Sequence, residues 1–231
     1  MPTVQGALLA AARTVLGDPV KLVGASRTDA GVHALRQVAS LTTESALDPP
    51  TVARALNATL PGDVRVLRAD EAPPDFDARR RATGKRYAYV IDAGRVAAPL
   101  LRRYAWHVAT PLDLDAMRAA LTAVRGTHDF SGFCAAAGRD AMPVCRVRSV
   151  HVVRRRSRVV VLVAADRFLH HMVRNLVGSA VAVGRGAREP KWLGEVLAGR
   201  DRRQAGATAP AHGLTLVRVL YRDGAGTRAN T

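Results

Sequence analysis

The residues best suited to chemistry lie in the stretch GASRTDAGVHALRQV, residues 24–38. There Asp29 stands between Arg27 and Gly31, with strand-like residues on both sides. An aspartate in a turn often only accepts hydrogen bonds from backbone N–H groups, and a glycine suits the turn itself. That interpretation leaves the neighbouring arginine unexplained. The alternative is a carboxylate that the turn presents as a nucleophile or base beside a cation.

Other chemical motifs find no support in the sequence. It has no HExxH, P-loop or GxSxG pattern, and the GRG at 184–186 fits a helix C-cap better than a dinucleotide loop. His170 and His171 are adjacent, so on a helix they would point about 100° apart and could not bind one ion together. We therefore expect no metal site.

The composition predicts a polyanionic partner. The net charge is +16, from 35 Lys plus Arg against 19 Asp plus Glu, and nearly all the cations are arginines. The arginine fork fits phosphate oxygens and stacks on bases, which favours nucleic acid over a membrane. A solvated arginine-rich surface is the alternative. Two cysteines predict reduced thiols, and the absence of a signal-type or membrane-length apolar run predicts a cytoplasmic protein.

Hydrophobic periodicity and turn residues predict the elements that must position these groups. Strands that follow each other without helical crossovers indicate antiparallel sheets, and hence an α+β fold. We expect a first domain over 1–98, a second over 99–222 and a disordered tail over 223–231. The predicted helices are 3–16, 48–61, 112–126, 167–186 and 189–200, and the predicted strands are 19–26, 36–43, 63–70, 85–92, 102–109, a hairpin over 147–166, and 213–222.

The stretch around Asp29 closely resembles the signature of the tRNA pseudouridine synthase A (TruA) family, roughly G-R-T-D-[AS]-G-V-H-A. Ser26 departs from it, where the family has glycine. Five further stretches resemble family segments in the same order, so the likeness extends from about Val4 to Tyr221. They are ALNATLPGDVRV (55–66), DFDARRRATGKRYAYVI (75–91), HDFSGF (128–133), DRFLHHMVRNLVGSAVAVGRG (166–186) and GLTLVRVLY (213–221).

The resemblance implies the fold and the reaction. The fold would be two similar α+β domains, each a mainly antiparallel sheet with helices on one face, with an active cleft between them and a homodimeric assembly. The enzyme would bind tRNA and isomerise uridine to pseudouridine at positions 38, 39 and 40 of the anticodon arm. No cofactor is expected, because the reaction involves neither redox chemistry nor group transfer.

The resemblance also assigns the catalytic residues. Asp29 would be the carboxylate that acts as nucleophile or as base for a glycal route, a choice the sequence leaves open. Arg174 would form an ion pair with it and keep it ionised; a surface arginine on a helix is the alternative. Tyr87 would pack on the flipped uracil. Since alternation places Tyr87 and Tyr89 on one strand face, a core pair is the competing interpretation.

Further residues would contact the RNA. Arg27 matches a family arginine that contacts the backbone and helps to extrude the base. A loop matches the family segment for base flipping, although a solvated charged loop is the alternative. Leu169 and His170 are weaker candidates for the same pocket. The loop residues are Phe76, Asp77, Ala78, Arg79 and Arg80.

Two points in the likeness leave room for other interpretations. Family members begin with a strand carrying Y-D-G and G-W-Q, whereas this sequence opens in the region that follows it, so we expect a truncation or a misplaced start codon. A non-catalytic RNA-binding protein is the main alternative function, and a pseudouridine synthase with another RNA target is the second. The presence of Asp29, Tyr87 and Arg174 favours catalysis.

Overall fold

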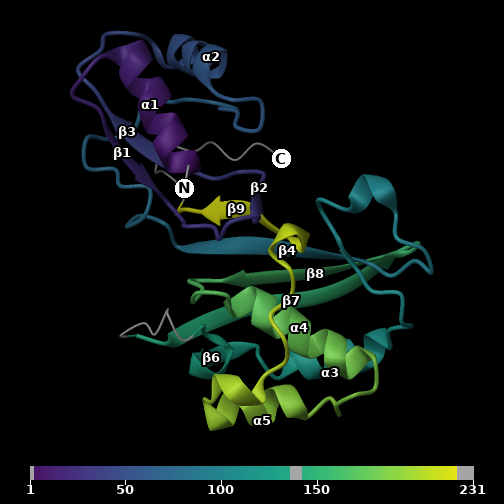
Figure 1. Ribbon diagram of the computed structural model, residues 1–231. Coiled ribbons are helices and arrows are strands. Elements are labelled where there is room, and N and C mark those ends of the chain that lie inside the picture. The colour runs from purple at the N-terminus through teal and green to yellow at the C-terminus, as the bar shows by residue number, and fades with distance from the viewer. Residues whose placement is uncertain (1–2, 136–141, 223–231) are drawn as a thin grey trace. The chain divides into compact units, whose positions relative to one another are not determined.

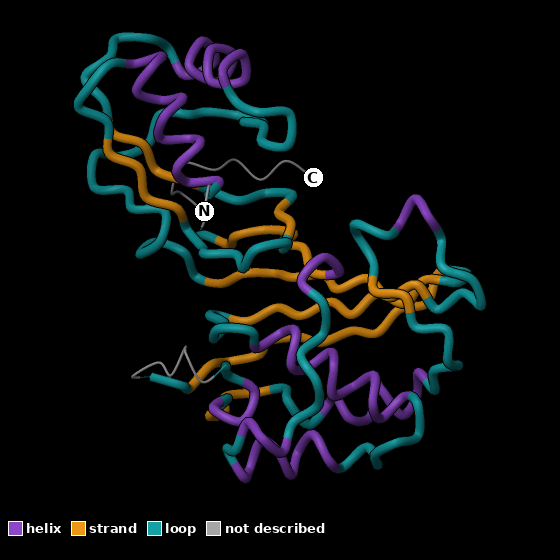
Figure 2. Tube along the Cα trace, viewed as in Figure 1, coloured by secondary structure: helices purple, strands orange, loops and turns teal. Residues whose placement is uncertain are grey.

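The computed structural model describes residues 3–135 and 142–222, and these form two compact units (Figures 1 and 2). The smaller unit draws on residues 1–27, 37–82 and 221–231, and the larger on 28–36 and 83–220. This division differs from the expected boundary near residue 98, because residues 84–92 are hydrogen-bonded within the sheet of the larger unit. The expected disordered tail, residues 223–231, lies outside the described residues.

The smaller unit contains two helices and a two-stranded sheet. Helix α1 (Val4–Leu16) and helix α2 (Pro49–Thr59) match the predicted segments, and strands β1 (Lys21–Gly24) and β3 (Ala39–Thr42) pair antiparallel. Side-chain caps and prolines define the helix starts, as the sequence indicates. The helices share an apolar core that is centred on Ala11, Ala12, Leu56 and Leu60.

The predicted strand over residues 63–70 is wrong. Its alternating pattern is real, but in the structure its backbone is bound by a side chain instead of a neighbouring strand. Asn57 donates from Nδ2 to the Val66 carbonyl at 2.8 Å and accepts the Val66 N–H on Oδ1 at 2.8 Å. An amide side chain can replace one rung of a ladder, and this one attaches the segment to helix α2.

The larger unit is built on a mixed sheet with the order β2-β9-β4-β8-β7-β6, and β5 pairs with β4. Most neighbours are antiparallel; β2 with β9 and β4 with β5 are parallel. The predicted hairpin is confirmed as β7 and β8. The strands are β2 (His33–Ala34), β4 (Gly84–Asp92), β5 (Trp106–His107), β6 (Gly126–Asp129), β7 (Val144–Arg155), β8 (Arg158–Ala165) and β9 (Leu214–Leu220).

Three helices cover one face of this sheet. Helix α3 (Leu114–Thr122) contacts β7, helix α4 (Met172–Gly184) contacts β4, and helix α5 (Trp192–Gly199) packs against both of these helices (Figure 1). Burial alternates along the strands accordingly, since successive side chains point to opposite faces. On β8 the alternation runs through the buried Val159, Val161 and Val163, and the last two residues, Ala164 and Ala165, are both buried. The predicted α+β fold is therefore confirmed.

Two predictions from composition can be compared with the structure. Cys134 and Cys145 are both buried thiols, as expected. Within residues 3–135 and 142–222, none of the helices combines the length and apolar character that a membrane span requires.

Candidate active site

Asp29 begins a tight turn that is attached to the sheet of the larger unit. The Val32 N–H donates to the Asp29 carbonyl at 3.0 Å, and Gly31 has a φ of +82°, a conformation that favours glycine. Immediately afterwards, β2 pairs with β9, and the Leu35 N–H donates to the Leu216 carbonyl at 2.9 Å. The glycine of the motif therefore serves the turn, and the turn fixes the carboxylate at one edge of the sheet.

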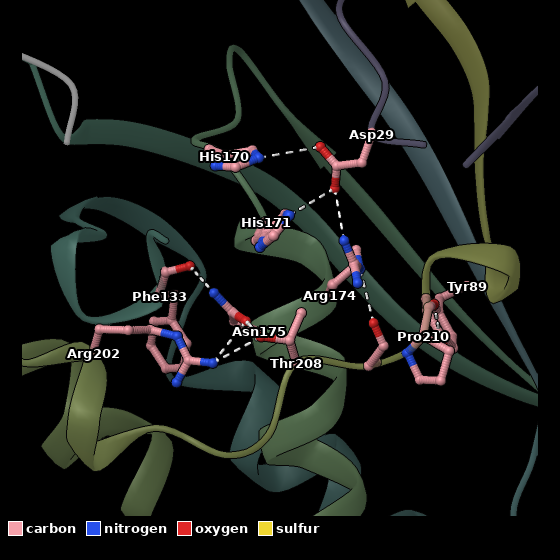
Figure 3. A network of polar contacts seen from close by, with 11 residues as sticks. Asp29, Tyr89, Phe133, His170, His171, Arg174, Asn175, Arg202, Thr208 and Pro210 are labelled. Carbon is pink, nitrogen blue, oxygen red and sulfur yellow. Dashed lines mark hydrogen bonds and ion pairs between the residues drawn. The ribbon is translucent and has the colours of Figure 1, made fainter. Parts of the chain in front are cut away.

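Three cationic or basic side chains converge on the Asp29 carboxylate (Figure 3). Arg174 Nη1 donates to Oδ2 at 2.8 Å, and His171 Nε2 lies 3.2 Å from the same oxygen. His170 Nε2 lies 3.4 Å from Oδ1. The Asp29 side chain keeps 25% of its surface exposed, so a reactant can still reach the carboxylate. The ion pair between Asp29 and Arg174, expected from the resemblance, is present.

The two histidines differ from the expectation that they lie on a helix and diverge. Helix α4 begins only at Met172, and His171 caps it with a left-handed backbone, φ 62°. Their rings consequently lie against each other, with centroids 3.9 Å apart and planes tilted by 36°, and both face Asp29 (Figure 3). Each of Asp29, His170 and His171 offers one metal-ligand atom within 4.8 Å of the others. The argument that they could not share an ion was therefore wrong, although the Arg174 guanidinium already supplies positive charge at Oδ2.

Arg174 is held at its other edge by the segment that precedes β9. Its Nε donates to the Ala209 carbonyl at 2.8 Å, and the Ala209 N–H donates to the Arg174 carbonyl at 3.2 Å. Only 14% of the Arg174 side chain is exposed. Because a guanidinium is a rigid planar fork, fixing Nε also fixes the direction in which Nη1 points. The segment over residues 205–210 thereby orients the cation toward Asp29.

A buried polar network ties this segment to helix α4 (Figure 3). Asn175, which is fully buried, donates from Nδ2 to the Phe133 carbonyl at 2.7 Å. Its Oδ1 accepts from Thr208 at 2.8 Å and from Arg202 at 3.0 Å, and Arg202 also donates to the Thr208 hydroxyl at 3.0 Å. Burial lowers the pKa of Arg202. A network whose members satisfy one another in this way resists local movement.

Burial also acts on the histidine nearest to Arg174. Desolvation lowers the pKa of His171, the Asp29 carboxylate opposes this, and the charges of His170, Arg174 and Arg202 lower the pKa further. Because its pKa is lowered, His171 stays neutral at pH values at which an ordinary imidazole is already partly protonated. The cluster thus combines one carboxylate, one permanent cation and two imidazoles that can carry protons.

Tyr87 lies on β4 and is 6% exposed. Its ring meets Phe168 edge to face, with centroids 5.0 Å apart, and Tyr89 on the same strand face donates to the Pro210 carbonyl at 2.8 Å. Both tyrosines therefore contribute to the core, as the competing interpretation holds. Leu169 is also buried. Contact of Tyr87 or Leu169 with a uracil stays a prediction.

Arg27 and the loop expected to contact the RNA, residues 76–80, belong to the smaller unit. The loop owes its shape to Asp77, whose carboxylate accepts the N–H groups of Arg79 and Arg80 at 2.8 Å each; the hydrogen bond from Arg80 is the main cause of its lowered pKa. Phe76 packs on Tyr221, centroids 5.5 Å apart. Buried Ala78 accepts from the Tyr221 hydroxyl at 2.7 Å. The exposed side chains are those of Arg27, Arg79 and Arg80.

The structure thus brings together Asp29, Arg174 and His170 from the predicted set. It adds His171 and the supporting residues Asn175, Arg202 and Thr208, which the sequence argument missed. One signal was available: Asn175 stands in a mainly apolar helix, and a polar residue that such a helix buries requires partners. Those partners come from residues 202–208 and could not be identified by spacing.

Comparisons with known proteins identify the family of this chain. A family model described as tRNA pseudouridine synthase matches residues 1–79 and 120–222. The protein "tRNA pseudouridine synthase A" of Myxococcus xanthus is 44% identical over 224 residues, which is 96% of this chain and 84% of that protein.

Two further relatives carry the same name. The protein from Chloroflexus aurantiacus is 45% identical over 227 residues, with 96% of this chain and 81% of that protein covered. The protein from Moorella thermoacetica is 43% identical over 220 residues, with 95% and 89% covered. The matches span most of both chains, so this chain belongs to the tRNA pseudouridine synthase A family.

Proposed function

We propose that this protein isomerises uridine to pseudouridine in tRNA, with Asp29 as the reactive carboxylate. The observation that carries the proposal is the Asp29–Arg174 pair, at 2.8 Å, on a carboxylate that remains partly exposed. Family membership supplies the reaction, and this geometry supplies a charged group suited to it. The N1–C1′ bond must break and a C5–C1′ bond must form, and a carboxylate beside the sugar can assist either as nucleophile or as base.

The arrangement favours Oδ1 as the reacting oxygen. Oδ2 is engaged by Arg174 at 2.8 Å and by His171 at 3.2 Å, whereas Oδ1 has His170 at the longer distance of 3.4 Å. Arg174 holds the carboxylate plane without occupying both oxygens. We therefore assign substrate contact to Oδ1 and orientation to Oδ2.

The finer proposals concern the target and the partners. We propose uridines 38, 39 and 40 of the anticodon arm as substrates, base flipping with Tyr87 against the uracil, a homodimer, and action in the cytoplasm. The net charge of +16 and the exposed Arg27, Arg79 and Arg80 support binding of the tRNA backbone. No cofactor enters the proposal.

The test is to express the chain in a strain that lacks its own enzyme and to map pseudouridine in tRNA by carbodiimide labelling. The wild type should restore labelling at positions 38–40. Asp29→Asn should abolish turnover and keep most tRNA affinity, because binding is spread over many phosphates. Asp63→Asn, at an exposed position outside the site, is the matched control and should keep full activity.

Three results would contradict the proposal. Turnover by Asp29→Asn would remove the carboxylate from the mechanism. Labelling at other tRNA positions would overturn the anticodon assignment. Tight tRNA binding by the wild type without any turnover would favour the non-catalytic RNA-binding protein instead.

A further inference from the structure

Pseudouridine formation moves the glycosidic bond from N1 to C5, and it also moves a proton from C5 to N1. Uridine carries hydrogen on C5 and the sugar on N1, whereas pseudouridine carries the sugar on C5 and hydrogen on N1. After C5 has bonded to C1′, C5 still holds its hydrogen and the ring has an N1=C6 double bond. A base must then remove that proton, and N1 must acquire one. Asp29 alone does not account for both transfers if it is engaged with the sugar.

The structure offers few groups for this task. Of the side chains within hydrogen-bond or ion-pair distance of Asp29 in the described ranges, Arg174 cannot act as a base, because a guanidinium stays protonated. The two imidazoles remain, at 3.4 and 3.2 Å from the carboxylate. An imidazole can take and return a proton near neutral pH, which makes it an efficient general base and acid.

Position separates the two histidines. His171 shares Oδ2 with Arg174 and keeps 26% of its side chain exposed, whereas His170 faces Oδ1 and keeps 42% exposed. The backbone of His170 is held in place, since the Ala135 N–H donates to the His170 carbonyl at 3.0 Å. His170 is therefore the imidazole beside the oxygen that we assign to the substrate, and it is the more accessible of the two.

The charges around the two histidines also favour His170 as the base. The two ring centroids lie 3.9 Å apart, so a positive charge on one imidazole would repel a positive charge on the other. Desolvation and the charges of His170, Arg174 and Arg202 lower the pKa of His171, although Asp29 opposes them, so His171 is the less suited of the two to hold a proton taken from the substrate. His170 Nε2 lies 3.4 Å from Asp29 Oδ1, so an imidazolium formed there during the reaction would face a carboxylate.

We propose, on the basis of the assigned function and of Asp29 as the reactive carboxylate, that His170 is a catalytic residue that removes the C5 proton. The unprotonated ring nitrogen of neutral His170 accepts that proton. The C5–H electron pair forms the C5=C6 double bond, the N1=C6 pair moves to N1, and N1 takes up a proton from the imidazolium. No proton is gained or lost overall.

The experiment uses tRNA transcripts labelled at uridine C5 with tritium or deuterium. Tritium release reports cleavage of the C5–H bond, and deuterium reports whether that cleavage limits the rate. His170→Gln should lower tritium release by about 100-fold, the smaller end of the contribution of a general base, and should introduce a primary isotope effect on product formation. His151→Gln, at an exposed position of β7, is the matched control and should match the wild type.

Chemical rescue separates catalysis from packing. His170→Ala should regain tritium release when imidazole is added, in proportion to the free-base concentration, and an altered fold would not respond in this way. Tyr87→Phe should show no new isotope effect. The assignment would be overturned if His170→Gln released tritium as fast as the wild type. It would also be overturned if Tyr87→Phe, and not His170→Gln, introduced the isotope effect.

The proposed function is tested by separate arms. The wild type must form pseudouridine, and Asp29→Asn must stop it. If these two results hold and His170→Gln behaves as the wild type, the inference about His170 alone is wrong.

Discussion

The substitution Gly178→Ala tests whether the segment over residues 205–210 orients Arg174. Gly178 lies on helix α4, one turn beyond Arg174, and the segment passes directly over it. A Cβ there would lie 3.1 Å from the Ala207 carbonyl carbon, 3.3 Å from the Ala209 nitrogen, and closer still to the Ala207 oxygen. Since carbon atoms in contact stay roughly 3.5–4.0 Å apart, the segment must retreat by roughly 1 Å or more.

The stability cost follows from two opposing effects. Overpacking against backbone costs up to about 3 kcal/mol, because backbone cannot rotate away as a side chain can. Replacing glycine by alanine in a helix returns up to about 1 kcal/mol. The net loss of about 2 kcal/mol should lower the melting temperature by roughly 4–8 °C in a chain of this size.

The effect on turnover should exceed the effect on stability. A retreat of the segment breaks the bond from Arg174 Nε to the Ala209 carbonyl, now 2.8 Å, and releases the guanidinium from its orientation. Misplacement of a catalytic group by about 1 Å can cost about 100-fold in rate. We therefore expect tritium release from C5-labelled tRNA to fall by about 10- to 100-fold below the melting transition, with tRNA affinity little changed.

Gly194→Ala is the matched control, because Gly194 also lies in a helix of the larger unit. Its Cβ would meet the Ala123 Cβ at 3.6 Å, an ordinary contact. This variant should melt about 1–4 °C higher and keep full activity. A Gly178→Ala protein with wild-type melting and wild-type turnover would refute both the close packing and the orienting role of residues 205–210.

Two further predictions concern solution conditions. The logarithm of the tRNA binding constant should fall steeply and linearly with the logarithm of the potassium chloride concentration, because binding by a chain of net charge +16 should release several counterions. A binding constant that does not change with salt would show that the arginines only keep the protein in solution. The free energy of unfolding should decrease as the pH falls from 7.5 to 5.5: burial lowers the pKa of His171 in the folded state, so the unfolded chain takes up the proton first. Chemical denaturation of His171→Gln should show a smaller decrease, and an identical pH dependence in both proteins would contradict this.

The sequence predicted the elements well where the local signal was strong. The hairpin of β7 and β8 and helix α2 follow from alternation, caps and prolines. The segment 63–70 failed because alternation shows that one side is buried and does not show what binds the backbone. Here Asn57 binds it, and a side-chain contact over nine residues leaves no periodic trace.

At the candidate site, too, some residues were predicted from the sequence and others were missed. Asp29 and Arg174 were found because each lies in a distinctive motif. His171 was dismissed because the helix was predicted from Arg167, whereas it starts at Met172 after a left-handed residue. A start that is wrong by five residues changes the direction of every side chain before it, and so two rings that were expected to diverge lie side by side instead.

Gly178 of helix α4 links the packing of the larger unit to the candidate site. Gly178 allows residues 207–209 to approach the helix closely, and only that approach places the Ala209 carbonyl on Arg174 Nε. Asn175, Arg202 and Thr208 then hold the segment in position from the neighbouring turn. The Asp29–Arg174 pair therefore depends on a series of contacts that is possible because residue 178 has no side chain. In this fold, the geometry at Asp29 is determined as much by what helix α4 lacks at Gly178 as by the charge that it carries at Arg174.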